Sequence, residues 1–141
     1  MHSMIASRIT KAILVDAVHV FVRKDGSIDG QLHALLKQYP HRKILLTGAD
    51  DVQMERFGLL KMPYEVFTLK HHPEKSDPAY YRKMLDHFAL TSHDVVYFEH
   101  DAQAVVSARS VGIRTFHYDQ DAKDLLALKE FLDMHFECES A

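Results

Sequence analysis

The polar residues that could perform chemistry are few, and most of them follow directly after a short apolar run. They are Asp16, Thr47 with Gly48, Lys75, and the group Glu99, His100 and Asp101. Carboxylates that come from separate strands suit a hard divalent cation such as Mg²⁺. A hydroxyl, an ammonium group and the N-terminus of a helix suit a phosphate or another small anion. These residue types predict a site for a metal ion and an anion, provided that the fold brings the segments together.

The segments around these residues alternate between two patterns, which predict how the residues are positioned. Apolar and β-branched runs predict buried strands at Ala12–Val15, Lys43–Leu46, Tyr64–Leu69, Asp94–Phe98 and Arg114–Tyr118. Helical spacing predicts helices from Asp29 to the stop at Tyr39-Pro40, at Gln53–Lys61, from Asp77-Pro78 to Phe88, at Ala102–Val111 and at Ala122–Phe136. We therefore expect an α/β fold, a doubly wound, mainly parallel five-stranded sheet with helices on both faces. In such a sheet ligands bind beyond the carboxyl ends of the strands.

The stretch after the first strand departs from this alternation. Residues Val20–Ile28 contain Asp25-Gly26, a pair typical of tight hairpin turns. We expect a small β-hairpin flap that projects from the carboxyl end of the first strand.

The composition is that of one folded domain. The chain has 141 residues, of which 47% are hydrophobic and 26% charged, with a net charge of −3 and a single cysteine. These values exclude collagen, low-complexity disorder and a disulfide-stabilised miniprotein. Without a basic stripe, we expect neither nucleic acid nor a membrane as a partner. We expect one domain over residues 1–141, without a signal peptide, in the cytoplasm. The expected partner is a small anion or phosphorylated ligand, with a protein partner as an alternative.

Four segments in this order resemble the motifs of the haloacid dehalogenase (HAD) superfamily. They are Ala12-Ile13-Leu14-Val15-Asp16, Ile44-Leu45-Leu46-Thr47-Gly48, Lys75-Ser76-Asp77-Pro78 and Val95-Val96-Tyr97-Phe98-Glu99. The resemblance implies that Asp16 is a nucleophile that forms a covalent aspartyl intermediate. It implies that Thr47, Gly48 and Lys75 hold the transferred group. It also implies that Asp16 binds Mg²⁺ together with Glu99 or Asp101.

The sequence departs from the family pattern in two motifs. HAD phosphatases have Asp-x-Asp, whose second aspartate protonates the leaving oxygen and later activates water, whereas Val18 stands at that position here. General acid–base assistance is typically worth about 10²–10⁴ in rate. The acidic pair of motif four becomes Glu99-His100. His19 and His100 follow separate strands, so they are candidates to replace the missing acid/base or to bind a transition metal with Asp16 and Glu99.

The spacing of the motifs predicts a core domain without a cap. The gaps from Asp16 to Thr47 and from Thr47 to Lys75 are too short to hold a cap domain. A dehalogenase tolerates Val18 better than a phosphatase does, because halide leaves without a proton, but it needs a closed, dry pocket. We expect an open site, suited to a macromolecular substrate, to closure by a neighbouring subunit, or to no substrate.

Each residue also has a structural interpretation. Asp16 can cap a loop, and Thr47 can belong to a turn. Glu99 and Asp101 can cap the helix that begins near Ala102. His41 and His71-His72 are expected to be solvated loop residues. Two functional hypotheses follow. One is a HAD-like binding or regulatory module without ordinary phosphatase chemistry, and the other is an active Mg²⁺-dependent phosphohydrolase. A phosphorelay receiver domain fits poorly, because Thr68-Leu69-Lys70 offers no aspartate at the end of the third strand.

Overall fold

A computed structural model of the chain describes residues 10–140, and the side chains of residues 10–136. The strands are β1 (Ala12–Asp16), β2 (Arg42–Thr47), β3 (Glu65–Thr68), β4 (Val95–Glu99) and β5 (Arg114–His117). The helices are α2 (Gly30–Leu36), α3 (Asp51–Arg56), α4 (Pro78–Phe88), α5 (Ala102–Ser110) and α6 (Leu125–Ser140), with a short 3₁₀ helix η1 (Ser92–Asp94). Strands and helices alternate along the chain as the sequence predicts.

All five strands form one parallel sheet in the order β3-β2-β1-β4-β5. The chain runs outward from the central β1 through β2 to β3. It then crosses back to β4, on the other side of β1, and ends the sheet with β5. The strand order therefore reverses next to β1, and a crevice at the carboxyl ends of β1 and β4 is the expected place for a ligand. The predicted doubly wound α/β fold is confirmed.

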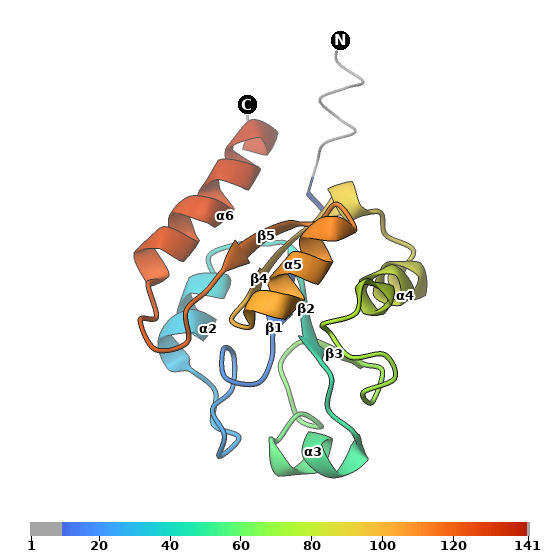
Figure 1. The fold of residues 1–141 in the computed structure, drawn as a ribbon. Helices are drawn as coiled ribbons and strands as arrows, with labels where there is room; N and C mark the ends of the chain where they lie inside the picture. The colour runs from blue at the N-terminus through green and yellow to red at the C-terminus, as the bar shows by residue number, and fades with distance from the viewer. Residues whose placement is uncertain (1–9, 141) are drawn as a thin grey trace.

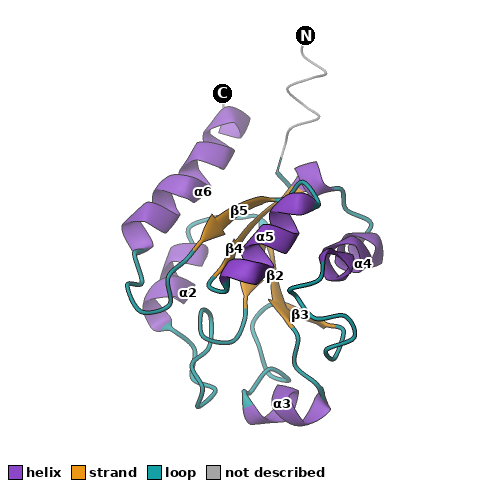
Figure 2. Cartoon of the chain, viewed as in Figure 1, coloured by secondary structure: helices purple, strands orange, loops and turns teal. Residues whose placement is uncertain are grey.

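Helices cover both faces of the sheet (Figures 1 and 2). Ile13 and Val15 pack into the core that the sheet forms with α2 and α6, whereas Ala12 and Leu14 pack into the core that it forms with α4 and α5. Successive side chains of a strand point to opposite faces. Asp16 therefore continues the row of Ala12 and Leu14 and lies on the α4 and α5 side of the sheet.

The flap after β1 is built around a turn rather than around two regular strands. Gly26 has a φ of +87°, and its N–H donates to the Arg23 carbonyl at 2.9 Å. The Arg23 N–H donates to the Ser27 carbonyl at 2.8 Å. Beyond this turn, isolated bridges join Val22 to Val18 and to Ile28. The expected Asp-Gly turn is present, but its strands are reduced to single bridges.

Local backbone signals explain where two helices differ from their predicted ranges. Helix α3 begins earlier because Asp50 and Gln53 form a capping box, and it ends before Gly58, which has a φ of +69°. Helix α6 begins at Leu125 rather than Ala122, after Lys123 with a φ of +49°. None of the helices within residues 10–140 has the length and apolar character needed to cross a membrane.

Candidate functional site

Strands β1 and β4 bring two carboxylates to the same place. In the parallel register of these neighbouring strands, Leu14 pairs with Tyr97. Asp16 and Glu99 each follow two residues later, so both side chains project from the α4 and α5 face at the carboxyl end of the sheet. Asp16 is 1% exposed and Glu99 is completely buried. Two carboxylates buried side by side require cations or hydrogen-bond donors close to them.

Lys75 supplies the ammonium group that joins the two carboxylates. Its Nζ donates to Asp16 Oδ1 at 2.7 Å and to Glu99 Oε1 at 2.6 Å. Lys75 comes from the loop before α4. The residue after it, Ser76, accepts a hydrogen bond through its carbonyl from the hydroxyl of Ser107 on α5. Helix α5 thus fixes the segment that carries Lys75.

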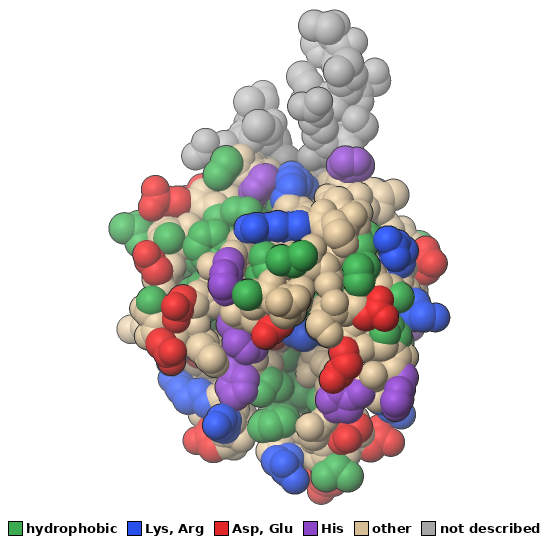
Figure 3. All heavy atoms as spheres, viewed as in Figure 1, with side chains coloured by type: hydrophobic (Ala, Val, Ile, Leu, Met, Phe, Trp, Pro, Cys, Tyr) green, Lys and Arg blue, Asp and Glu red, His purple; other side chains and the backbone are tan. Residues whose placement is uncertain are grey.

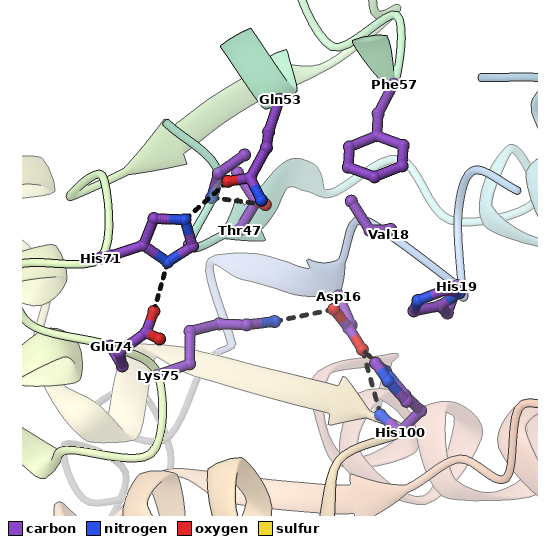
Figure 4. Close-up of a pocket in the computed structure, with 12 residues that line it drawn as sticks. Asp16, Val18, His19, Thr47, Gln53, Phe57, His71, Glu74, Lys75 and His100 are labelled. Atoms are coloured by element: carbon purple, nitrogen blue, oxygen red, sulfur yellow. Dashed lines mark hydrogen bonds and ion pairs between the residues drawn. The ribbon is translucent and has the colours of Figure 1, made fainter. Parts of the chain in front are cut away.

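His100 closes the network from the opposite side (Figure 4). Its Nδ1 is hydrogen-bonded to Asp16 Oδ2 and lies 3.3 Å from Glu99 Oε2. Its backbone N–H donates to Asp16 Oδ2 at 3.1 Å, and its carbonyl accepts from His117 Nε2 at 2.8 Å. The ring and the backbone of His100 are therefore both held in place.

Two further donors complete the surroundings of Glu99. The Tyr97 hydroxyl donates to Glu99 Oε1, and the backbone N–H of Asp101 donates to Glu99 Oε2 at 3.0 Å. Sequence analysis did not single out the Tyr97 side chain, although its place two residues before Glu99 on a strand puts both on one face. The Asp101 carboxylate, expected among the metal ligands, instead caps α5 by accepting from the Ala104 N–H at 2.9 Å.

The pKa values of these groups shift in opposite directions. Burial and the neighbouring Glu99 carboxylate raise the pKa of Asp16 to about 6. Burial also acts to raise the pKa of Glu99, but Lys75 and His100 hold it well below its usual value. Hydrogen bonds to Asp16 and Glu99 raise the pKa of His100 to about 10. The pKa of Lys75 lies well above its usual value, because the two carboxylates outweigh the effect of burial. With all four groups ionised, two anions face two cations.

A pocket of about 310 Å³ opens beside this network, and Asp16, Lys75 and His100 line it. Figure 3 shows histidine side chains on both sides of the hollow in the lower half of the molecule. Val18 and Phe57 form an apolar part of the wall (Figure 4). The position two residues after Asp16 therefore faces the pocket, but it offers no proton.

His19 lines the pocket next to His100. The two rings pack edge to face with their centroids 5.3 Å apart, so the histidines expected near Asp16 do lie together. Burial and the neighbouring His100 lower the pKa of His19. Of the two histidines, His100 is the one whose ring is hydrogen-bonded to the Asp16 carboxylate.

Thr47, the last residue of β2, and Gly48 lie on the pocket wall, as the motif order predicts. Thr47 Oγ1 accepts from the Ala49 N–H at 3.1 Å, which tightens the turn. The Thr47 carbonyl accepts from the Tyr80 hydroxyl at 2.7 Å. Helix α4 thereby holds this turn through Tyr80, and the loop before the same helix carries Lys75.

A second polar cluster lies on the same wall, and sequence analysis missed it. His71 Nδ1 lies 2.6 Å from Glu74 Oε1, and His71 Nε2 lies 2.6 Å from Gln53 Oε1. Gly48 makes room for it, because a Cβ atom there would lie 3.2 Å from Glu74 Oε1. His71 is a loop residue whose side chain is 35% exposed, as expected, but it also lines the pocket. Its position after a strand that ends at the same edge was the available signal.

One group of side chains could hold a metal ion. Asp16, Glu99 and His100 each offer a donor atom, and these atoms lie within 4.8 Å of one another. Mg²⁺ requires a nearly octahedral set of oxygen ligands at about 2.0–2.1 Å. All four carboxylate oxygens of Asp16 and Glu99, however, already accept hydrogen bonds or ion pairs from the protein. As they are arranged, these residues do not fit Mg²⁺.

Several solved structures have the same fold. A HAD-family enzyme from Bacteroides thetaiotaomicron, in complex with magnesium and inorganic phosphate, is 13% identical, with a TM-score of 0.63 over 77% of this chain and 93% of its own. The cobalt-bound deoxy-D-mannose-octulosonate 8-phosphate phosphatase of Haemophilus influenzae is 13% identical, with a TM-score of 0.54 over 95% of this chain and 91% of its own. An uncharacterised protein from Corynebacterium glutamicum is 14% identical, with a TM-score of 0.57 over 86% of this chain and 94% of its own.

No family model and no curated protein matches the sequence. The likeness is therefore one of fold, and it agrees with the order of the four motifs and with the strand order of the sheet. The chain has the fold of the haloacid dehalogenase superfamily.

Proposed function

We propose that this chain is a binding or regulatory module on the HAD fold that does not act as an ordinary phosphatase. The observation that carries the proposal is Val18 on the pocket wall, two residues after Asp16. Hydrolysis of an ordinary phosphate ester needs a proton for the leaving oxygen, and such assistance contributes about 10²–10⁴ in rate. An isopropyl side chain cannot supply that proton.

The hydrogen bonds of Asp16 support the same conclusion. Its Oδ1 accepts from Lys75, and its Oδ2 accepts from the ring and the backbone of His100. Charge-assisted hydrogen bonds stabilise a carboxylate in its resting state. The lone pairs that would attack a phosphorus atom are therefore engaged, which makes Asp16 a weaker nucleophile and a better fixed part of a binding site.

We propose a small phosphorylated molecule or another small anion as the ligand. Lys75 and His100 present cationic groups to the pocket, and Thr47 and Gly48 offer a hydroxyl and a backbone turn. The volume of about 310 Å³ is at the lower end of the range of about 300–1,000 Å³ for small-molecule sites. Phe57 and Val18 suit a less polar part of the same ligand.

An assay with an aryl phosphate tests this proposal, because a good leaving group hardly needs protonation. We expect wild-type protein to bind inorganic phosphate, measured by calorimetry, without measurable turnover of p-nitrophenyl phosphate. Val18→Asp supplies a carboxylate that can activate the water needed for hydrolysis of an aspartyl intermediate, so turnover should become measurable in this variant. Val18→Asn has the same shape without an acid and is the control. Wild-type turnover that disappears in Asp16→Asn would contradict the proposal.

A second candidate function is an active Mg²⁺-dependent phosphohydrolase. It is favoured by Asp16 and His19, which line the same pocket. It would require Asp16 and Glu99 to exchange hydrogen bonds within the protein for contacts with Mg²⁺. Asp16 would then be the nucleophile, with His19 or a water molecule as the proton donor. Turnover by wild-type protein that requires Mg²⁺ and is lost in Asp16→Asn supports this function over the first, and additional loss in His19→Asn assigns the proton to His19.

A further inference from the structure

We propose that His100 takes the place of a divalent cation between Asp16 and Glu99, so that the pocket binds its ligand without a metal ion. This inference deepens the proposed binding function. Only its statement about the ligand rests on that function. Its basis is the position of one atom, because His100 Nδ1 is hydrogen-bonded to Asp16 Oδ2 and lies 3.3 Å from Glu99 Oε2. A bridging ion would need the lone pairs of these same two oxygens.

The other two carboxylate oxygens are satisfied by a different cation. Lys75 Nζ donates to Asp16 Oδ1 at 2.7 Å and to Glu99 Oε1 at 2.6 Å. The ammonium group and the imidazole ring thus each bridge the two carboxylates. A buried carboxylate is stable only when its charge is balanced and its oxygens are hydrogen-bonded. The protein meets both requirements with its own side chains.

Hydrogen bonds and a ring contact fix the position of the His100 imidazole ring. The backbone N–H of His100 donates to Asp16 Oδ2 at 3.1 Å, and its carbonyl accepts from His117 Nε2 at 2.8 Å. The ring of His19 packs against it, with centroids 5.3 Å apart. An ion could enter only by displacing a ring that the backbone and two neighbouring side chains position. A proton on Nδ1 therefore does the bridging that a metal would do.

This arrangement has a consequence for the ligand. Lys75 and His100 both line the pocket, while Glu99 lies behind them and is completely buried. A small anion such as phosphate then meets two side-chain cations directly. The two cations offset the electrostatic repulsion between the anion and the Asp16 carboxylate, so binding should not need a metal ion.

Mn²⁺ binding, followed by electron paramagnetic resonance of the free ion, tests the inference. We expect no saturable binding to wild-type protein at millimolar Mn²⁺. His100→Asp replaces the N–H donor by a third carboxylate and should tighten Mn²⁺ binding at least about tenfold. His93→Asp is the matched control, because His93 is exposed and precedes β4 whereas His100 follows it. The inference is overturned if wild-type protein binds Mn²⁺ as His100→Asp does, or if folded His100→Asp binds no better than His93→Asp.

A measurement on the wild-type protein keeps the inference testable if His100→Asp does not fold. The proton NMR signal of the His100 ring N–H should appear far downfield and stay unchanged when Mg²⁺ or Zn²⁺ is added. Loss of that signal on addition of either metal overturns the inference.

The ligand is tested separately. We expect inorganic phosphate to bind equally well in EDTA and in Mg²⁺. A requirement for Mg²⁺ overturns the inference about His100. No phosphate binding in either condition overturns the proposed ligand, while the Mn²⁺ and NMR results still decide the role of His100.

Discussion

The two ends of the sheet carry charged residues in opposite ways. At the amino end, Arg42 pairs with Glu65 at 2.6 Å, and their side chains are 44% and 53% exposed. At the carboxyl end, Lys75 pairs with Asp16 at 2.7 Å, where the Asp16 side chain is only 2% exposed. Exposed pairs contribute little to stability. Buried charges are costly and are tolerated only while their partners remain. This difference fits the proposed binding site, because the carboxyl end retains its charges despite the cost of burying them.

The largest expected effect comes from removing the shared cation at the carboxyl end. Lys75→Met leaves Asp16 and Glu99 buried next to each other without their ammonium partner, and it should destabilise the protein by about 3–5 kcal/mol. Lys11→Met is the matched control at the amino end, where Lys11 pairs with Asp94 at 3.7 Å and is largely exposed. It should cost less than about 1 kcal/mol. Urea denaturation measures the free energy of unfolding of both variants. Equal decreases in the two variants would contradict the difference between the two ends of the sheet.

The next effect is a loss of stability at alkaline pH, caused by His100. Hydrogen bonds to Asp16 and Glu99 raise its pKa from 6.5 to about 10 in the folded protein. This contribution is fully present below pH 6.5 and is lost as the pH rises through about 10. His100→Asn should therefore be less stable than wild type near pH 6, with the gap narrowing toward pH 10. Thermal melting across this range tests it, and a gap that does not change with pH contradicts the assignment.

A smaller effect is expected at the turn that carries Thr47. Tyr80→Phe removes the buried hydroxyl that donates to the Thr47 carbonyl at 2.7 Å, and it should cost about 1–3 kcal/mol. The control is Tyr118→Phe, because the buried Tyr118 hydroxyl has no hydrogen-bond partner among the described residues. That change should stay within about 0.5 kcal/mol. The contrast fails if the two substitutions have the same effect on the urea midpoint.

The smallest effect is expected at the amino end and has the opposite dependence on pH. Partial burial acts to raise the pKa of Asp94, but the Thr91 N–H, at 2.8 Å, and Lys11 hold it below its usual 3.8. Its contribution is present above pH 3.8 and is lost as the pH falls through the folded-state value. Asp94→Asn should thus be slightly less stable than wild type at neutral pH and equal to it in strong acid. Melting temperatures between neutral pH and pH 2 would show whether the difference shrinks.

Most of the fold could be predicted because its signals are local. The strand predicted at Ala12–Val15 differs from β1 by one residue, and the helix opened by Asp77-Pro78 begins where Asp77 caps it. The flap was overestimated because Asp-Gly specifies a turn but not the length of its strands. The start of α3 was missed although the sequence shows the signal, because Asp50 and Gln53 have the three-residue spacing of a capping box.

The sequence predicted which residues lie at the candidate site, but it did not predict which of them form hydrogen bonds with one another. Motif order predicted that Asp16, Lys75 and Glu99 meet, since parallel strands end at one edge. The roles of Tyr97 and His71 depended on which side chains come within hydrogen-bond distance. Residue type allowed Asp101 to be either a metal ligand or a helix cap, and the structure places its carboxylate as the cap of α5. Residue type specifies which hydrogen bonds a side chain can form. It does not specify which of several available partners the side chain bonds to in the folded protein.

The sequence by itself determined the alternation of strands and helices, the positions of the polar residues at strand ends, and the aliphatic group at position 18. These are properties of the chain, set by periodicity and residue type. Only the tertiary structure decided that His100 bridges Asp16 and Glu99 and that His71 joins the pocket wall. Those contacts join segments distant in the chain, and their formation depends on distances of a few tenths of an ångström that no local pattern encodes.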